Sequence, residues 1–253
     1  MARHVQITAD DALLDNAAKT LATNIQFASV DNPIRSVEVT SSVPNEGKSS
    51  LAVLLAKAMA QGGQRVVLVE CDMRRRSLGG ILGVHGRSGV YSVLAGAVKA
   101  SEAVLTTPIS GVYLLDCEPY IPNPVDILSS QRFINLIEGL KKDYGYVVVD
   151  TPPLSTFVDA AVVSGAVDGT LLVVRQNFVR RDELKNAHDQ LKKANANVIG
   201  AVMTFCEADK SEQYYSSYYR EDGTKVKSPK SKGKRGGKAE AAPTGAHYSR
   251  YDR

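Results

Sequence analysis

The sequence predicts an α/β fold in which a mostly parallel β-sheet carries helices on both faces. Short apolar segments alternate with longer segments of helical periodicity along most of the 253 residues. Two short segments, 65–70 (R-V-V-L-V-E) and 146–150 (Y-V-V-V-D), are apolar almost throughout, which is typical of parallel strands covered on both sides. A hydrophobic content of 43% is ample for the core of one such domain. We therefore expect a doubly covered, mostly parallel sheet.

The other elements follow from the spacing of apolar residues and from turn residues. Glycines at 62 and 63 are expected to end the helix before the strand at 65–70. The full set of predicted elements comprises helices over 10–27, 51–60, 127–142 and 181–194, short helices within 79–100, strands at 36–40, 65–70, 112–115, 146–150, 170–174 and 198–203, and an extended loop at 119–124.

The stretch 36–50 places a strand, a tight loop and a helix in direct succession. The loop reads S-S-V-P-N-E-G-K-S-S, and Ser42 stands where the usual motif has its first glycine. Loop amides and a helix N-terminus offer positive charge to a polyphosphate, so the pattern predicts the phosphate-binding loop of a P-loop NTPase. The residues expected to bind the nucleotide are Pro44, Asn45, Glu46, Gly47, Lys48, Ser49 and Ser50.

Carboxylates follow two of the predicted strands, where ligands bind in open α/β sheets. Glu70 and Asp72 end the strand at 65–70, and Asp150 ends the strand at 146–150. Lys48 would reach the β- and γ-phosphates of a bound nucleotide, and the Ser49 hydroxyl would hold Mg²⁺. Carboxylates from two strands that converge on this loop fit a site for a metal-bound nucleotide. One acid then remains to act as a base.

Composition divides the chain into a helical segment (1–35), the phosphate-loop domain (36–207) and a tail (208–253). The formal charge is only +4, but the tail is rich in lysine and tyrosine, so we expect it to be disordered and solvated rather than bound to nucleic acid. Three scattered cysteines indicate neither disulfides nor a metal site, and fit a reducing cytosol. The sequence contains neither an apolar run long enough to cross a bilayer nor a signal-peptide pattern. We therefore expect a cytoplasmic chain that reaches the membrane through a partner.

These motifs resemble those of the cytoplasmic bacterial tyrosine kinases of the CpsD/CapB type, a branch of the MinD/ParA-like phosphate-loop ATPases. The resemblance covers about 16–204. Its motifs are the Walker A segment above, a Walker A′ segment V-L-V-E-C-D-M-R-R, a Walker B segment V-V-V-D-T-P-P, the segment P-N-P-V-D-I-L-S-S-Q-R-F at 122–133, and the pair Asp159-Ala160.

The tail strengthens the resemblance, because six of the eleven tyrosines lie after residue 210. The family phosphorylates such clusters between copies of the kinase. The resemblance therefore implies an ATP-dependent autokinase acting in trans, with 36–207 as its kinase domain. The implied acceptors are Tyr214, Tyr215, Tyr218, Tyr219, Tyr248 and Tyr251.

The resemblance also implies catalytic roles for Lys48, Glu70 and Asp72, and a metal site formed by Ser49, Asp72 and Asp150. Glu70 stands where the family has an aspartate. The resemblance implies that the residue at this position takes the proton from the hydroxyl of the incoming tyrosine. Glutamate keeps the carboxylate but adds one methylene. A displacement on the order of 1 Å can cost roughly a hundredfold in rate, so this departure bears directly on a kinase assignment.

Several partners are implied by the resemblance alone. These are another copy of the kinase, a cognate tyrosine phosphatase, and a separate transmembrane regulator of polysaccharide chain length. This regulator would recruit the kinase to the inner face of the plasma membrane and activate it there, in capsular or extracellular polysaccharide synthesis. The family's ring-assembly motif E-x-x-R-x-x-R falls on Asn16, Lys19 and Ala22, so two of its three charges are absent. Thr204 replaces an asparagine that contacts adenine in the family.

Two other functions remain open from the sequence. A MinD/ParA-like ATPase switch would use the same loop, but the signature lysine of those proteins is absent from the positions of Ser41, Ser42 and Val43. A weakly active regulatory subunit that binds nucleotide would fit the glutamate at position 70.

Overall fold

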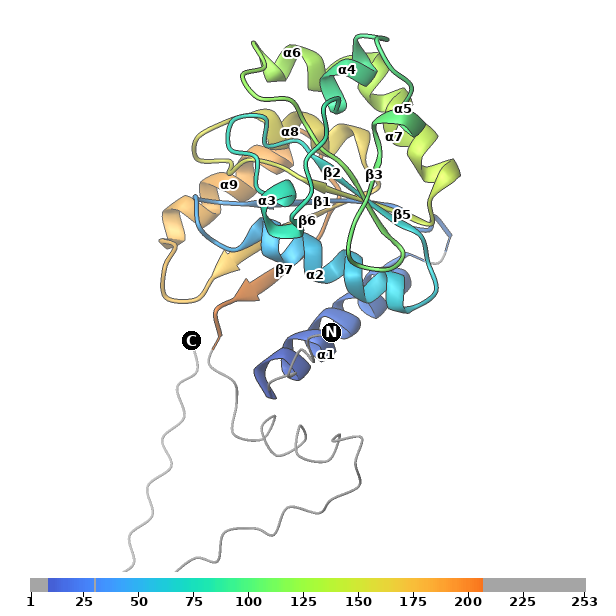
Figure 1. The fold of residues 1–253 in the computed structure, drawn as a ribbon. Helices are drawn as coiled ribbons and strands as arrows, with labels where there is room; N and C mark the ends of the chain where they lie inside the picture. The colour runs from blue at the N-terminus through green and yellow to red at the C-terminus, as the bar shows by residue number, and fades with distance from the viewer. Residues whose placement is uncertain (1–8, 30, 207–253) are drawn as a thin grey trace, which may run out of the picture.

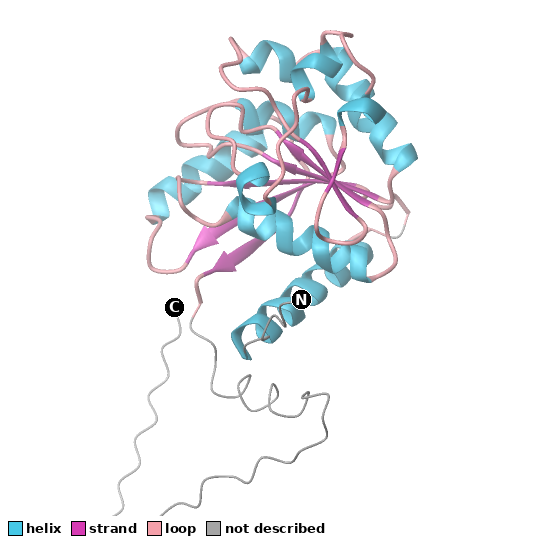
Figure 2. Ribbon diagram, viewed as in Figure 1, coloured by secondary structure: helices cyan, strands magenta, loops and turns pink. Residues whose placement is uncertain are grey.

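The computed structural model describes residues 9–29 and 31–206, and their strands form one sheet (Figures 1 and 2). Its strand order is β3-β4-β2-β5-β1-β6-β7. All neighbouring pairs are parallel except β3 with β4. The predicted mostly parallel sheet is therefore confirmed. The strands are β1 (Ser36–Ser41), β2 (Val66–Glu70), β3 (Leu105–Thr106), β4 (Val112–Leu115), β5 (Tyr146–Asp150), β6 (Gly169–Arg175) and β7 (Val198–Thr204).

Helices cover both faces of this sheet, as the uniformly apolar strands predict (Figure 1). The pleat of β2 shows why, because Val66 and Leu68 join one apolar cluster while Val67 and Val69 join another. The first cluster contains α1 (Ala9–Phe27), α2 (Lys48–Gln61) and α3 (Leu78–Leu82). The opposite face carries α4 (Val90–Leu94), α5 (Ala100–Ala103), α6 (Pro124–Leu128), α7 (Gln131–Asp143), α8 (Asp159–Val163), the 3₁₀ helix η1 (Ser164–Ala166) and α9 (Arg181–Lys193).

The helix expected over 127–142 is wrong as a single element. The chain forms α6, breaks, and restarts as α7. Ser130 causes the restart, because its backbone is extended and its side-chain oxygen accepts a hydrogen bond from the Phe133 amide. The short β3 and α8 were not expected either, since elements of two to five residues leave little periodicity to detect.

The predicted tyrosine-rich tail and all six predicted acceptor tyrosines lie outside the described residues. Within 9–29 and 31–206, every helix is too short or too polar to cross a bilayer.

A buried carboxyl group joins three strands at the centre of the sheet. Glu38 of β1 is fully buried. It accepts hydrogen bonds from Thr151 Oγ1, which follows β5, at 3.0 Å and from Thr170 Oγ1 of β6 at 2.9 Å. Burial raises the pKa of Glu38 to about 8, although both hydroxyl hydrogen bonds oppose the rise. The carboxyl group is therefore mostly protonated in the folded protein at neutral pH.

We expect Glu38 to make the protein less stable as the pH rises. The folded-state pKa of about 8 exceeds the ordinary value of 4.5, so the folded chain binds more protons than the unfolded chain between these values. Below pH 4.5 this contribution is fully present, and it is lost as the pH rises through 8. Glu38→Gln should remove a pH-dependent part of the unfolding free energy on the order of 4 kcal/mol, measured by urea unfolding from pH 5 to 9.

Glu118→Gln is the matched control. Burial opposes ionisation of Glu118, but hydrogen bonds from the Ser92 side chain and from the Gly89 and Ser92 amides outweigh it and lower the pKa. Glu118 is therefore ionised in both the folded and the unfolded chain from pH 5 to 9, so Glu118→Gln should leave the slope of stability against pH as in the wild type. If the wild type and Glu38→Gln gave parallel curves across pH 5 to 9, the inferred titration of Glu38 would be wrong.

Candidate functional site

The loop between β1 and α2 has a backbone that only certain residues accept. Gly47 has φ +87° and Asn45 has φ +66°, both in the left-handed region that favours glycine and asparagine. A Cβ atom on Gly47 would also lie 3.2 Å from Cε2 of Phe205, just after β7. The glycine before Lys48 is thus required for two reasons, and the loop turns directly into α2.

Glu46 ties this loop to the neighbouring strands. Its buried side chain accepts hydrogen bonds from the Val43 amide at 2.8 Å and from the Arg175 amide, at the end of β6, at 3.0 Å. Its own carbonyl oxygen accepts one from Thr204 Oγ1 of β7 at 2.7 Å. Glu46 is one of the residues predicted to bind the nucleotide, and this stays a prediction; its side chain holds the loop in shape.

Lys48 brings the separate predicted residues together. Its ammonium lies 3.2 Å from Asp72 Oδ2, after β2, and 3.7 Å from Asp150 Oδ1, at the end of β5. It also donates a hydrogen bond to Ser49 Oγ at 3.3 Å. All these residues are largely buried. The structure therefore places the predicted lysine, hydroxyl and two carboxylates within one cluster at the carboxyl ends of β1, β2 and β5.

Ser77 belongs to the same cluster, and the sequence analysis missed it. Its hydroxyl donates to Ser49 Oγ at 2.7 Å and lies 3.4 Å from Asp150 Oδ2. A serine seven residues beyond a strand carries no recognisable motif, so its place depends on the path of the loop. The same loop makes a second contact through Arg74. The Arg74 guanidinium stacks on the Phe157 ring and donates a hydrogen bond to Asp159 at 3.3 Å.

The cluster holds more negative than positive charge. Burial raises the pKa of Asp150 above its ordinary value, although the Lys48 charge opposes the rise. Burial and the charge of Asp150 likewise raise the pKa of Glu70. Burial alone would lower the pKa of Lys48, but the charges of Asp150, Asp72 and Glu70 outweigh it and raise it. A further cation would stabilise these buried carboxylates.

The donor set fits a magnesium ion that arrives with a nucleotide. Asp150 Oδ1 is buried and has no hydrogen-bond partner, so it is available to a cation. Within 9–29 and 31–206, no cluster of three or more His, Cys, Asp or Glu side chains could hold a metal ion alone. Mg²⁺ usually takes one or two carboxylates and completes its shell with phosphate oxygens and water. Ser49, Asp72 and Asp150 match that pattern.

Glu70 is engaged by backbone amides. Its carboxylate is fully buried and accepts hydrogen bonds from the amides of Asp72 at 3.1 Å, Ser77 at 2.8 Å and Leu78 at 2.9 Å. The structure thus places Glu70 beside the cluster, with both oxygens already engaged.

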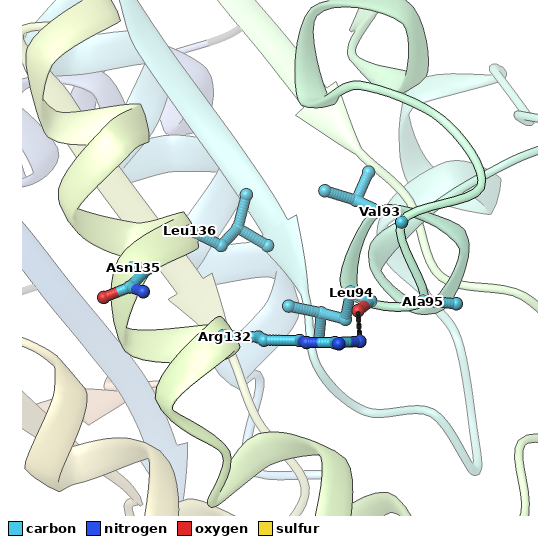
Figure 3. A pocket seen from close by; sticks show the side chains of 7 residues that line it. Val93, Leu94, Ala95, Arg132, Asn135 and Leu136 are labelled. Carbon is cyan, nitrogen blue, oxygen red and sulfur yellow. Dashed lines mark hydrogen bonds between the residues drawn. The ribbon is translucent and has the colours of Figure 1, made fainter.

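Two surface hollows lie apart from the phosphate loop. One of about 340 Å³ lies between α4 and α7, lined by residues 93–96 together with Arg132, Asn135 and Leu136 (Figure 3). There Arg132 donates to the Leu94 carbonyl oxygen at 3.0 Å. Another, of about 520 Å³, is lined in part by the basic side chains of Arg35, Arg65 and Lys142. Neither hollow contains a predicted site residue.

Comparison with known proteins places this geometry in a family. Residues 45–179 match the AAA domain family. The putative tyrosine-protein kinase CapB of Staphylococcus aureus is 31% identical over 202 residues, which are 80% of this chain and 88% of the relative. The chain belongs to the tyrosine-protein kinase family of CapB. The kinase fold agrees with the solved chimerical protein CapA2B2, which is 30% identical with a TM-score of 0.71, over 74% of this chain and 83% of that one.

A septum site-determining protein MinD from Pyrococcus horikoshii, solved with Mg-ADP, shares the fold of this kinase. It is 20% identical, with a TM-score of 0.59 over 72% of this chain and 76% of that one. The expected α/β class of P-loop NTPases is thus confirmed for the tyrosine-protein kinase.

Two departures of this kinase from the expected family pattern now have a structural context. Ser42 replaces a glycine, and its buried Oγ has no hydrogen-bond partner, while its carbonyl accepts from the Ser155 amide. Thr204 replaces an asparagine, and its hydroxyl is engaged by Glu46. The Thr204 hydroxyl is therefore committed to the phosphate loop, whereas Ser42 is held through its backbone carbonyl.

We expect Glu46→Ala to weaken nucleotide binding by the kinase about tenfold. The change leaves two amide donors, those of Val43 and Arg175, without their acceptor, at a cost of about 1–3 kcal/mol for each buried group. Calorimetric titration with ADP and Mg²⁺ measures the effect. Glu138→Ala on α7, whose side chain is exposed and pairs with Lys141, serves as control and should bind like wild type. Equal affinity for Glu46→Ala and wild type would contradict the anchoring role.

Proposed function

We propose that this chain is an ATP-dependent protein-tyrosine autokinase that phosphorylates its own C-terminal tyrosines in trans. The observation that carries the proposal is the position of the Lys48 ammonium between Asp72 and Asp150 at the end of a phosphate-binding loop. The relatives named tyrosine-protein kinases support the choice of tyrosine as acceptor.

Binding and orientation come first in the proposed reaction. The loop amides and the N-terminus of α2 hold the phosphates of ATP, and Lys48 neutralises the charge of the transferred group. A magnesium ion held by Ser49, Asp72 and Asp150 would stabilise negative charge on the phosphates. Because phosphoryl transfer has a loose transition state, positioning and electrostatics supply most of the catalysis. The cluster of buried charges suits that task.

The acceptor tyrosines are proposed from the sequence and the family. Tyr214, Tyr215, Tyr218, Tyr219, Tyr248 and Tyr251 lie in a stretch of sequence that is polar and basic, and in this proposal a second copy phosphorylates them. Phosphates would add negative charge to this positive segment and change its interactions.

The proposed setting is polysaccharide synthesis at the membrane. We infer a separate transmembrane regulator of chain length as activator, a cognate tyrosine phosphatase and self-association, all by family resemblance. The names of the capsule-type relatives support this setting. In this proposal the kinase works at the inner face of the plasma membrane, in control of capsular or extracellular polysaccharide synthesis and export, without nucleic acid.

Phosphotyrosine should form on the tail when the purified chain is incubated with ATP and Mg²⁺. To test transfer between copies, Lys48→Met with an intact tail is mixed with a chain whose six tail tyrosines are changed to phenylalanine. The Lys48→Met chain should carry label only in the mixture, since its own loop lacks the ammonium that neutralises the phosphates. Mass spectrometry of the tail peptides measures the sites.

Each partner alone is the control, and the cytoplasmic segment of the activator is added to one set of reactions. Phosphotyrosine on Lys48→Met without the active partner would contradict the role of Lys48. ATP hydrolysis without any tyrosine label, even with the activator segment, would instead favour the MinD/ParA-like switch. Nucleotide binding with neither activity would favour a regulatory subunit.

A further inference from the structure

Glu70 links both ends of one loop. One carboxylate oxygen accepts from the amide two residues ahead, at Asp72, and the other accepts from the amides seven and eight residues ahead, at Ser77 and Leu78. The segment 72–77 therefore closes on itself around this buried side chain. Its far end continues directly into α3 (Leu78–Leu82).

The enclosed loop carries two members of the Lys48 cluster. Asp72 contacts the Lys48 ammonium through Oδ2 and accepts the Arg75 amide through Oδ1. Ser77 donates to Ser49 Oγ at 2.7 Å, and Ser49 lies in the first turn of α2. A shift of the loop would therefore move a carboxylate and a hydroxyl at the site together.

The length of the side chain matters for this link. Glu70 must reach amides at opposite ends of the loop from a fixed point at the end of β2, where it is paired in register with Asp150 of β5. An aspartate at this position places its carboxylate nearer the strand by one methylene. It could keep the amide of Asp72 only by giving up those of Ser77 and Leu78, or the reverse.

We propose that Glu70 is a positioning residue, which holds the loop 72–77 so that Asp72 and Ser77 meet Lys48 and Ser49, rather than the group that takes the proton of the acceptor tyrosine. The test of this inference by turnover rests on the proposed kinase function, whereas its test by Mg-ADP binding does not. Both carboxylate oxygens already accept amide hydrogens in a fully buried setting. Three of the roughly four acceptor sites of a carboxylate are thus taken, and a side chain buried this completely would have to leave amide donors to reach a substrate hydroxyl.

Glu70→Asp separates the two roles. If Glu70 took the proton, this change would restore the family's residue, and labelling would stay equal or increase. If Glu70 positions the loop, Glu70→Asp should raise the Kd for Mg-ADP and the KM for ATP about tenfold and also lower kcat. Glu70→Gln should show a similar loss, because an amide cannot accept from all three donors. Glu102→Asp is the matched control, since that exposed glutamate on α5 also accepts a backbone amide, at Lys99.

A double-mutant cycle tests whether Glu70 acts through Ser77. Ser77→Ala alone should raise the Kd for Mg-ADP, but should add little in the Glu70→Asp background, because the loop has already left its place. Fully additive effects on the Kd, or Glu70→Asp with unchanged affinity and turnover, would overturn the proposal. Thermal unfolding and far-UV circular dichroism establish that each variant is folded.

The measurements also separate this inference from the kinase proposal. If the wild type binds Mg-ADP but never labels tyrosine, the kinase function fails while the binding cycle still tests the loop. Should Glu70→Asp not fold, Glu70→Gln and Ser77→Ala supply the same cycle. The amide hydrogens of 72–78 should exchange with deuterium at least tenfold faster in either Glu70 variant, and unchanged protection there would contradict the link.

Discussion

The buried ammonium of Lys48 among carboxylates is the interaction on which the site depends. Lys48 lies against Asp72 and Asp150, and the charge of Glu70 acts on it as well. Buried charges are costly unless they are paired, and the loss of one partner leaves the others uncompensated. With one cation for several acids, the cluster has an unmet preference for positive charge. That imbalance is what makes it suited to a metal-bound nucleotide rather than to structural support alone.

The parallel sheet produces this meeting of distant residues. Val39 of β1 lies opposite Asp150 of β5, and Glu70 of β2 lies opposite the same residue on the other side. Since parallel strands end at the same edge, the residues that follow them approach one another without a specific contact to guide them. The loops after β1 and β2 then need only short paths to bring the Lys48 ammonium and the Asp72 carboxylate to Asp150, the last residue of β5.

This explains how much the sequence alone could predict. Uniformly apolar strands indicated a covered parallel sheet, and the acids after them indicated the edge at which Lys48, Asp72 and Asp150 meet. The path of a loop is set by tertiary hydrogen bonds instead, so Ser77 had no signal in the sequence. The break between α6 and α7 was missed for a related reason, because a single capping serine outweighed a continuous apolar spacing.

Three fully buried glutamates show why a residue type at a motif position does not define its role. Glu38 accepts two hydroxyl groups at the centre of the sheet. Glu46 and Glu70 accept backbone amides and thereby fix the two loops that border the site. A hydroxyl can rotate away when its partner changes, whereas a backbone amide moves only with its chain. A carboxylate committed to amides therefore acts through the backbone, and its contribution to chemistry is the geometry that it maintains.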